Sequence, residues 1–100
     1  MTERELVFED FNSRVNRRFT MLDEHERASE ITLVECSQRP ADDPRSFTLL
    51  FRGAPDGPAV QGMYLLSADD FEPAPVFLVP VARTSDGVDY HAVFNHYDGG

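Results

Sequence analysis

The segment Val76–Asn95, VFLVPVARTSDGVDYHAVFN, decides the fold class of this protein. Its first part, Val76–Val81, is an almost continuous apolar run, and its last part, Val88–Phe94, alternates more openly between apolar and polar residues. Both patterns are typical of β-strands. The segment therefore predicts a pair of strands that carries much of the core.

A turn signal separates the two predicted strands. Asp86 tolerates a left-handed backbone, and Gly87 adopts positive φ at little cost, so we expect a hairpin turn centred on Asp86-Gly87. Phe77 and Phe94 lie in the most apolar part of this hairpin, and we expect both to be buried in the main core. Pro80 has no N–H to donate to a ladder, which indicates a strand edge or a bulge at that position.

Four more strands are predicted upstream, because β-branched and aromatic runs alternate with Pro, Gly and charged breakers every ~8–12 residues. The segment Ala68–Pro75 is acidic, holds two prolines and is expected to be a loop. Short connections favour antiparallel pairing. The sequence thus predicts a mainly β protein, a small antiparallel barrel or sandwich of about six strands. The four upstream strands are expected at residues 19–22, 30–37, 47–51 and 62–66.

An N-terminal helix is predicted over residues 2–18. Thr2 and Glu5 have capping-box spacing, and Phe8, Phe11 and Val15 recur on one helical face. A shorter helix that ends near Ser13 also fits. The whole chain, residues 1–100, is expected to be one domain, with a β body at 19–95 and a polar tail at 96–100.

Composition and charge exclude several classes of protein. Apolar residues make up 41% of the chain, which is typical of a globular domain, and no apolar run approaches the ~20 residues of a membrane span. The charged N-terminus lacks the pattern of a signal peptide, so a cytoplasmic location is expected. The formal net charge of −9 disfavours nucleic-acid binding.

The residues that most often carry chemistry form no recognisable site. His91 and His96 are an odd number of positions apart, which puts them on opposite faces of a straight strand, and His25 lies in a charged turn. Asp42-Asp43 and Asp69-Asp70 lack the spacing of a calcium loop. We therefore expect no catalytic residue, no metal and no cofactor.

Cys36 is the only cysteine, so an intramolecular disulfide is impossible. It alternates with apolar neighbours in the predicted strand 30–37, where Ile31, Leu33 and Glu35 share one face and Cys36 lies on the other. A buried and unreactive thiol is expected.

Two features suggest contacts with other proteins. Arg14, Arg17 and Arg18 form a small basic patch that suits a partner or an anion, although positive charge at a helix end also compensates the helix dipole. The terminal Gly99-Gly100 is what a ubiquitin-like modifier would use for conjugation. Against that reading, a β-grasp fold needs a hairpin before its helix, and here the helix comes first.

The order of several motifs resembles a family of short, uncharacterised bacterial proteins, a domain of unknown function. The motifs are Gly62-x-Tyr64-x-Leu66, Phe77-Leu78-Val79-Pro80 and Tyr90-x-Ala92-Val93-Phe94-Asn95, together with Asp10-Phe11 and the strand from Phe47 to Gly53. Members of that family often occur beside phage-tail-collar-type proteins. The resemblance implies a structural or accessory role in assembly, with a tail or collar component as the partner, and it supplies no catalytic residues.

These observations predict a non-enzymatic structural or interaction protein, an accessory or chaperone of a phage-tail-like assembly. The alternatives are the diglycine modifier and a small-ligand-binding β-barrel. In the barrel, large aromatic side chains would line a pocket unless they simply fill the core. They are Phe47, Phe51, Tyr64, Phe77, Tyr90 and Phe94.

Overall fold

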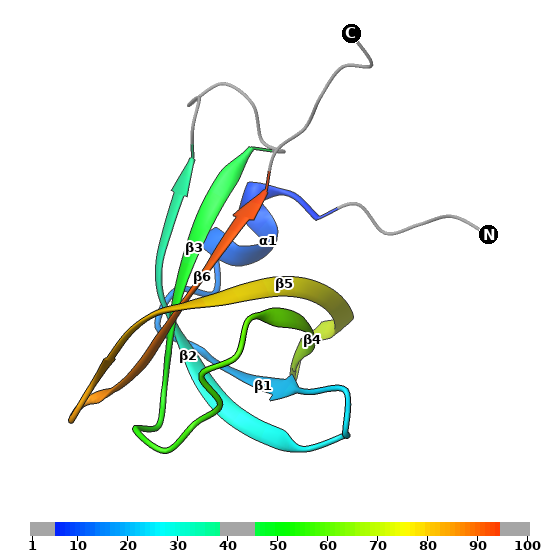
Figure 1. Cartoon of the computed structure of the whole chain (residues 1–100). Helices are drawn as coiled ribbons and strands as arrows, with labels where there is room; N and C mark the ends of the chain where they lie inside the picture. The colour runs from blue at the N-terminus through cyan, green and yellow to red at the C-terminus, as the bar shows by residue number, and fades with distance from the viewer. Residues whose placement is uncertain (1–5, 39–45, 95–100) are drawn as a thin grey trace, which may run out of the picture.

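A closed antiparallel barrel of six strands forms the body of the protein (Figure 1). The computed structural model describes residues 6–38 and 46–94. The strands neighbour one another in the order β1-β2-β3-β6-β5-β4, and β4 pairs back onto β1. The mainly β fold is thereby confirmed, and it is a barrel. In chain order the elements are α1 (Phe8–Asn12), β1 (Arg18–Leu22), β2 (Ala28–Gln38), β3 (Phe47–Gly53), β4 (Gly62–Ala68), β5 (Phe71–Thr84) and β6 (Gly87–Phe94).

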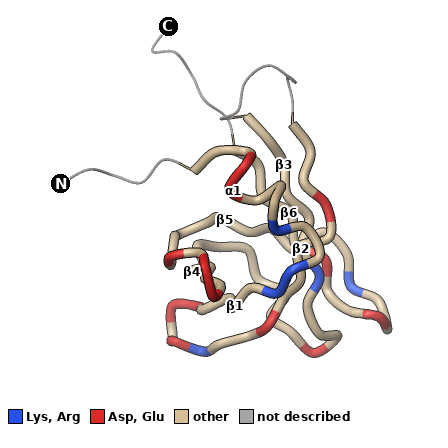
Figure 2. The backbone as a smooth tube through the Cα atoms, turned by 180° about the vertical axis from the view of Figure 1, so that it is seen from behind, with Lys and Arg blue, Asp and Glu red and all other residues tan. Residues whose placement is uncertain are grey.

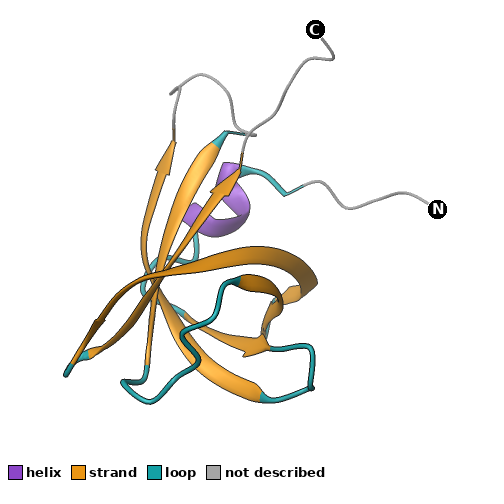
Figure 3. Cartoon of the chain, viewed as in Figure 1, coloured by secondary structure: helices purple, strands orange, loops and turns teal. Residues whose placement is uncertain are grey.

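The barrel splits at one end, where α1 fits into the opening (Figures 1 and 3). The pairing of β5 with β6 stops at Val79↔His91, while β6 continues alongside β3 as far as Phe94. The helix places Phe11 in this opening with none of its surface exposed. A plug of aromatic rings therefore closes this end of the core. The centroid of the Phe11 ring lies 5.2–6.2 Å from those of Phe19, Phe47, Phe71 and Phe94.

The helix is much shorter than the predicted range 2–18, and its end agrees with the alternative of a helix that ends near Ser13. It ends at Asn12, and β1 begins at Arg18. In between, Asn16 adopts φ 75° and donates its backbone N–H to the carbonyl oxygen of Leu33, at 2.7 Å. The chain after residue 12 is thus bound to β2, and this pairing replaces further helical turns. Thr2 and Glu5 lie outside the described residues, and no described helix is long and apolar enough to cross a membrane.

The β5–β6 turn lies one residue earlier than predicted. Thr84 pairs with Gly87, so Ser85 and Asp86 are the central turn residues. Gly87 has φ 151°, and a Cβ atom there would collide with the carbonyl oxygen of Gly53 on β3. Glycine is therefore required at position 87 by the neighbouring strand as well as by the backbone conformation.

The prediction of a loop at 68–75 is also wrong, because β5 already begins at Phe71. Its prolines are tolerated there because, among the described strands, this part of β5 pairs with β4 alone, and Pro73 and Pro75 fit a strand with one unpaired side. The expectation for Pro80 is confirmed, since the register shifts between Pro80 and Ala82.

A second bulge changes which residues of β2 face the core. Ile31 and Leu33 are both buried and lie on the same face of β2, but the register with β3 shifts between Leu33 and Glu35. After the shift Glu35 is exposed, while Cys36 lies opposite Leu49 and is half-buried against the core. The predicted grouping of Glu35 with Ile31 is therefore wrong, because a bulge exchanges the two faces of a strand.

Candidate functional site

The outer face of β4 and β5 is apolar, although it faces solvent. Met63 and Phe77 are 57% and 47% exposed, Leu65 is 38% exposed, and Pro75 is exposed as well. The strand register pairs Met63 with Phe77 and Leu65 with Pro75, so the four residues form two adjacent cross-strand pairs. We call them the outer strip. A solvated face of an antiparallel sheet is normally polar, so this strip is unusual.

The prediction that Phe77 is buried in the main core is wrong. Its neighbours Val76 and Leu78 take the inward positions of β5 and are 2% and 0% exposed. Phe77 consequently points outward and lies opposite Met63 on β4, not opposite β6. Phe94 is partly buried and packs on the core, with its ring stacked on Phe47 at a centroid distance of 4.5 Å.

A groove adjoins the outer strip at Met63. Its volume is about 560 Å³, and it lies between the turn that links β1 to β2 and the segment that links β3 to β4. Pro58, Val60 and Tyr64 give it an apolar wall, and Asp23 and Glu24 form part of its rim. Val60 is 67% exposed. We call this feature the acidic groove.

Two buried tyrosines fix the wall of the groove. The hydroxyl of Tyr64 donates a hydrogen bond to the carbonyl oxygen of Val60, and that of Tyr90 donates to the carbonyl oxygen of Pro58. Burial raises the pKa of both tyrosines, that of Tyr90 to about 12. The 54–61 link, teal in Figure 3, is thereby attached to the barrel interior and presents a defined surface.

The acidic rim is built by a local turn. The Oδ1 atom of Asp23 accepts backbone N–H bonds from His25 and Arg27, each 2.8 Å long. The bond from Arg27 is the main reason that the pKa of Asp23 is lowered, so this carboxylate is ionised at neutral pH. The side chain of Glu24 is 86% exposed, and its Oε1 lies 3.7 Å from Nε2 of His25. Figure 2 shows this acidic turn on the same side of the barrel as the acidic β4–β5 turn.

The three arginines predicted as a partner patch lie near one another, in the 13–17 link and at the start of β1. Arg14 is mostly buried: its Nε lies 3.3 Å from Oδ1 of Asp70, and its guanidinium lies 5.3 Å from the Phe71 ring centre. Arg17 also reaches Asp70, at 3.8 Å, and is 62% exposed. Arg18 lies 3.5 Å from Glu30 and is 75% exposed. Arg14 thus holds the 13–17 link to the β4–β5 turn, and a partner role for the patch stays a prediction.

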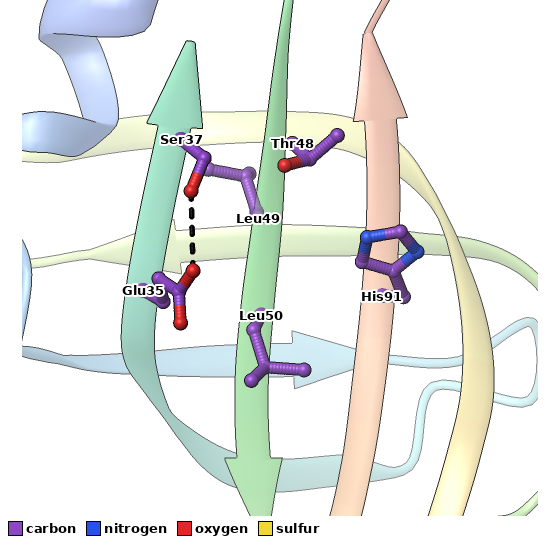
Figure 4. Close-up of a pocket in the computed structure, with 6 residues that line it drawn as sticks. All are labelled: Glu35, Ser37, Thr48, Leu49, Leu50 and His91. Atoms are coloured by element: carbon purple, nitrogen blue, oxygen red, sulfur yellow. Dashed lines mark hydrogen bonds between the residues drawn. The ribbon is translucent and has the colours of Figure 1, made fainter. Parts of the chain in front are cut away.

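His91 lies on the outer face of β6, beside a depression of about 230 Å³ (Figure 4). In the strand register, His91 on β6 and Glu35 on β2 both pair with Leu50 of β3. The imidazole and the carboxylate therefore lie on opposite sides of β3. The hydroxyl of Ser37 donates to Glu35 at 3.1 Å. Within residues 6–38 and 46–94, no group of three His, Cys, Asp or Glu side chains is placed to hold a metal ion.

Burial raises the pKa of the Cys36 thiol to about 11, which agrees with the predicted unreactive cysteine. Several residues weighed as sites lie outside the described part of the chain, namely His96, the Asp42-Asp43 pair and the terminal Gly99-Gly100.

Four of the six aromatic residues expected inside the barrel are there; Phe94 is only partly buried against the core, and Phe77 points outward. Phe47, Phe51, Tyr64 and Tyr90 are each at most 5% exposed and belong to one contiguous core. The outer strip was missed because Phe77, in the apolar run 76–81, was expected in the core, and no outward face was assigned in the apolar run 62–66. The available signal was their lack of alternation, since an antiparallel strand with one solvated face should alternate.

Comparison with known proteins identifies the family. A family model described as a domain of unknown function, DUF6916, matches residues 6–94. No curated protein and no solved structure matches the chain. The matched range includes every described helix and strand, from α1 to the end of β6. The protein therefore belongs to the DUF6916 family.

Proposed function

We propose that this protein is a non-enzymatic interaction protein that binds another protein through the outer strip. The observation that carries the proposal is the pairing of Met63 with Phe77 and of Leu65 with Pro75 on a solvated sheet face. Burial of apolar surface stabilises a contact by ~25 cal/mol per Å², so covering these side chains is favourable. Large apolar residues next to one another on an otherwise charged protein are typical of protein-binding sites.

The backbone beneath the strip favours a binding role. β4 and β5 pair over nearly the whole length of β4, and the inward residues of both strands are anchored in the core. The outward side chains are therefore held in a fixed arrangement before any partner arrives. Such preorganisation lowers the entropy cost of binding.

The resemblance to a family found beside phage-tail-collar-type proteins makes a tail-like assembly the first place to look for the partner. In this proposal the protein acts as an accessory or chaperone of that assembly. An apolar surface that is exposed in the free protein and covered in the complex suits either role.

Site-specific photocrosslinking in the native host tests the proposal. A photoreactive amino acid at position 77 should give a discrete crosslinked species with another protein. The matched control is the same amino acid at position 93, because Val93 is 55% exposed and also outward, but lies on β6. Equal crosslinking from both positions, or none from position 77, would contradict the proposal.

A second measurement addresses the non-enzymatic part. The partner found by crosslinking should copurify with the parent protein and with Val93→Ser, and its yield should fall strongly with Phe77→Ser. Turnover of a small molecule by the purified protein, unaffected by Phe77→Ser, would overturn the non-enzymatic part of the proposal.

A further inference from the structure

We propose that the outer strip and the acidic groove together bind a protein segment in which apolar side chains are flanked by Lys or Arg. This inference rests on the interaction role proposed above and specifies the chemistry of the partner. The two features are continuous, because Met63 belongs to both: it pairs with Phe77 in the strip and lines the groove.

The apolar part of the surface accepts apolar anchors. The groove volume of about 560 Å³ is large enough for more than one side chain, and exposed Val60 and Met63 lie at its apolar wall. Beyond Met63 the strip continues to Phe77, Leu65 and Pro75. A partner segment with successive apolar residues would cover both parts at once.

The charged residues around the groove favour a partner that carries positive charge. Among the residues that line the groove, Asp23 and Glu24 are acidic and Arg27 is basic, while His25 is formally neutral. An adjoining depression of about 490 Å³ shares Asp23 and Arg27 and adds Asp56. The local balance is therefore negative.

The other end of the strip carries both signs of charge. The β4–β5 turn holds Asp69 and Asp70, and Figure 2 shows this turn on the same side of the barrel as the β1–β2 turn that forms the groove rim. Arg14 and Arg17 approach Asp70, while exposed Asp69 shares a depression with Arg17 and Arg18. A cationic segment is therefore attracted mainly to the groove end, and complementary charge directs encounter and orientation.

The same charges disfavour a second copy of this chain as the occupant. Two copies joined through the strip would each bring a groove rim with a negative balance into the contact region. The formal net charge of −9 on each copy adds a longer-range repulsion. The partner is therefore expected to be a different and basic protein surface.

Selection from a random-peptide library displayed on phage, with the full chain as the target, tests the inference. We expect enriched peptides with apolar residues flanked by Lys or Arg. Synthetic versions should bind the parent at least ~10-fold more tightly than Phe77→Ser, because an apolar anchor would be lost. Glu24→Gln should weaken binding ~2- to 5-fold, as expected for an exposed ion pair, and added salt should weaken it further.

The matched control for Glu24→Gln is Glu35→Gln. Glu35 is also exposed and acidic, but it lies on β2 beside the depression that holds His91. Its replacement should leave peptide affinity unchanged. Equal weakening by both variants would mean that only the overall charge of the protein matters, which would overturn the proposed groove.

The remaining outcomes separate this inference from the interaction role. Peptides that depend on Phe77 but show no preference for Lys or Arg would overturn the inference and leave the interaction role intact. A dimer in sedimentation experiments that dissociates with Phe77→Ser would show that a second copy covers the strip. This result would overturn the inference about a basic partner and leave the interaction role intact. Failure to select any peptide that depends on Phe77, together with no crosslinking from position 77, would overturn both.

Discussion

The two faces of the β4–β5 ribbon are both apolar, yet only one of them lies in the core. On the inner face Leu66 and Leu78 have no exposed surface, whereas Met63 and Phe77 on the outer face are about half exposed. Leu78 follows Phe77 directly in the sequence. Hydrophobicity alone therefore does not assign these residues to a face, and the difference between the faces must come from strand pairing and closure of the barrel.

The comparison separates the face that stabilises the fold from the face that we propose binds a partner. The inner face belongs to the single buried core to which all six strands contribute, so its changes should alter the free energy of unfolding. The outer face contacts solvent, so its changes should alter partner binding and leave folding almost unaffected. Four predictions test this separation, from the largest expected effect to the smallest.

Leu78→Ala should lower the free energy of unfolding by ~2–5 kcal/mol, because it leaves a cavity in the barrel interior. Denaturant titration followed by circular dichroism measures this change. A loss below ~1 kcal/mol would show that the inner face is not the closely packed face.

The free energy of unfolding should fall at alkaline pH because the phenol of Tyr90 loses its proton there. Its pKa is raised by burial to about 12, above the ordinary value of 10.0, so the folded state holds the phenol proton more strongly than the unfolded state does. The resulting stabilisation is complete below pH 10 and is lost as the pH rises toward 12. Unfolding midpoints measured at intervals across this range should show the decline.

Tyr90→Phe is the control for the pH effect. It should reduce the alkaline decline and, at neutral pH, cost ~0.5–1.5 kcal/mol through loss of the hydrogen bond to Pro58. Cys36→Ser and Tyr64→Phe account for the other raised pKa values near this range, that of the thiol at about 11 and that of the Tyr64 phenol. An unchanged alkaline decline in Tyr90→Phe would show that Tyr90 does not cause it.

Phe77→Ala should change the free energy of unfolding by less than ~1 kcal/mol, because the side chain is already about half exposed. The same titration as for Leu78→Ala measures it, so the two adjacent positions are compared directly. A loss of ~3–5 kcal/mol, as for a buried phenylalanine, would place Phe77 in the core and remove the outer strip as a binding surface.

Asp69→Ala should change stability by less than ~0.5 kcal/mol, since the residue is an exposed turn acid. Isothermal titration with a peptide selected on the parent protein should show a small loss of affinity in the same variant. A marked loss of stability would indicate a folding role for Asp69 in the β4–β5 turn, in place of the electrostatic role proposed here.

Much of the fold could be predicted from the sequence because its signals are local. Alternating β-branched and aromatic runs, with Gly and Pro between them, mark strands and turns without reference to the rest of the chain. Six strands, antiparallel neighbours and the irregularity at Pro80 follow from such signals, and all are present. The packing of Phe8 and Phe11 on the core likewise agrees with their helical spacing, whereas Val15 packs on the core from beyond the end of the helix.

Only the tertiary structure decided the face of each apolar residue and the length of the helix. Whether Phe77 or Leu78 points inward depends on register, and register is set by pairing with β4 and by the bulge after Pro80. The helix ends at Asn12 because the next residues bond to Leu33, far along the chain. The outer strip could not be predicted for the same reason, since an apolar run has no preferred face until the partner strands are in place.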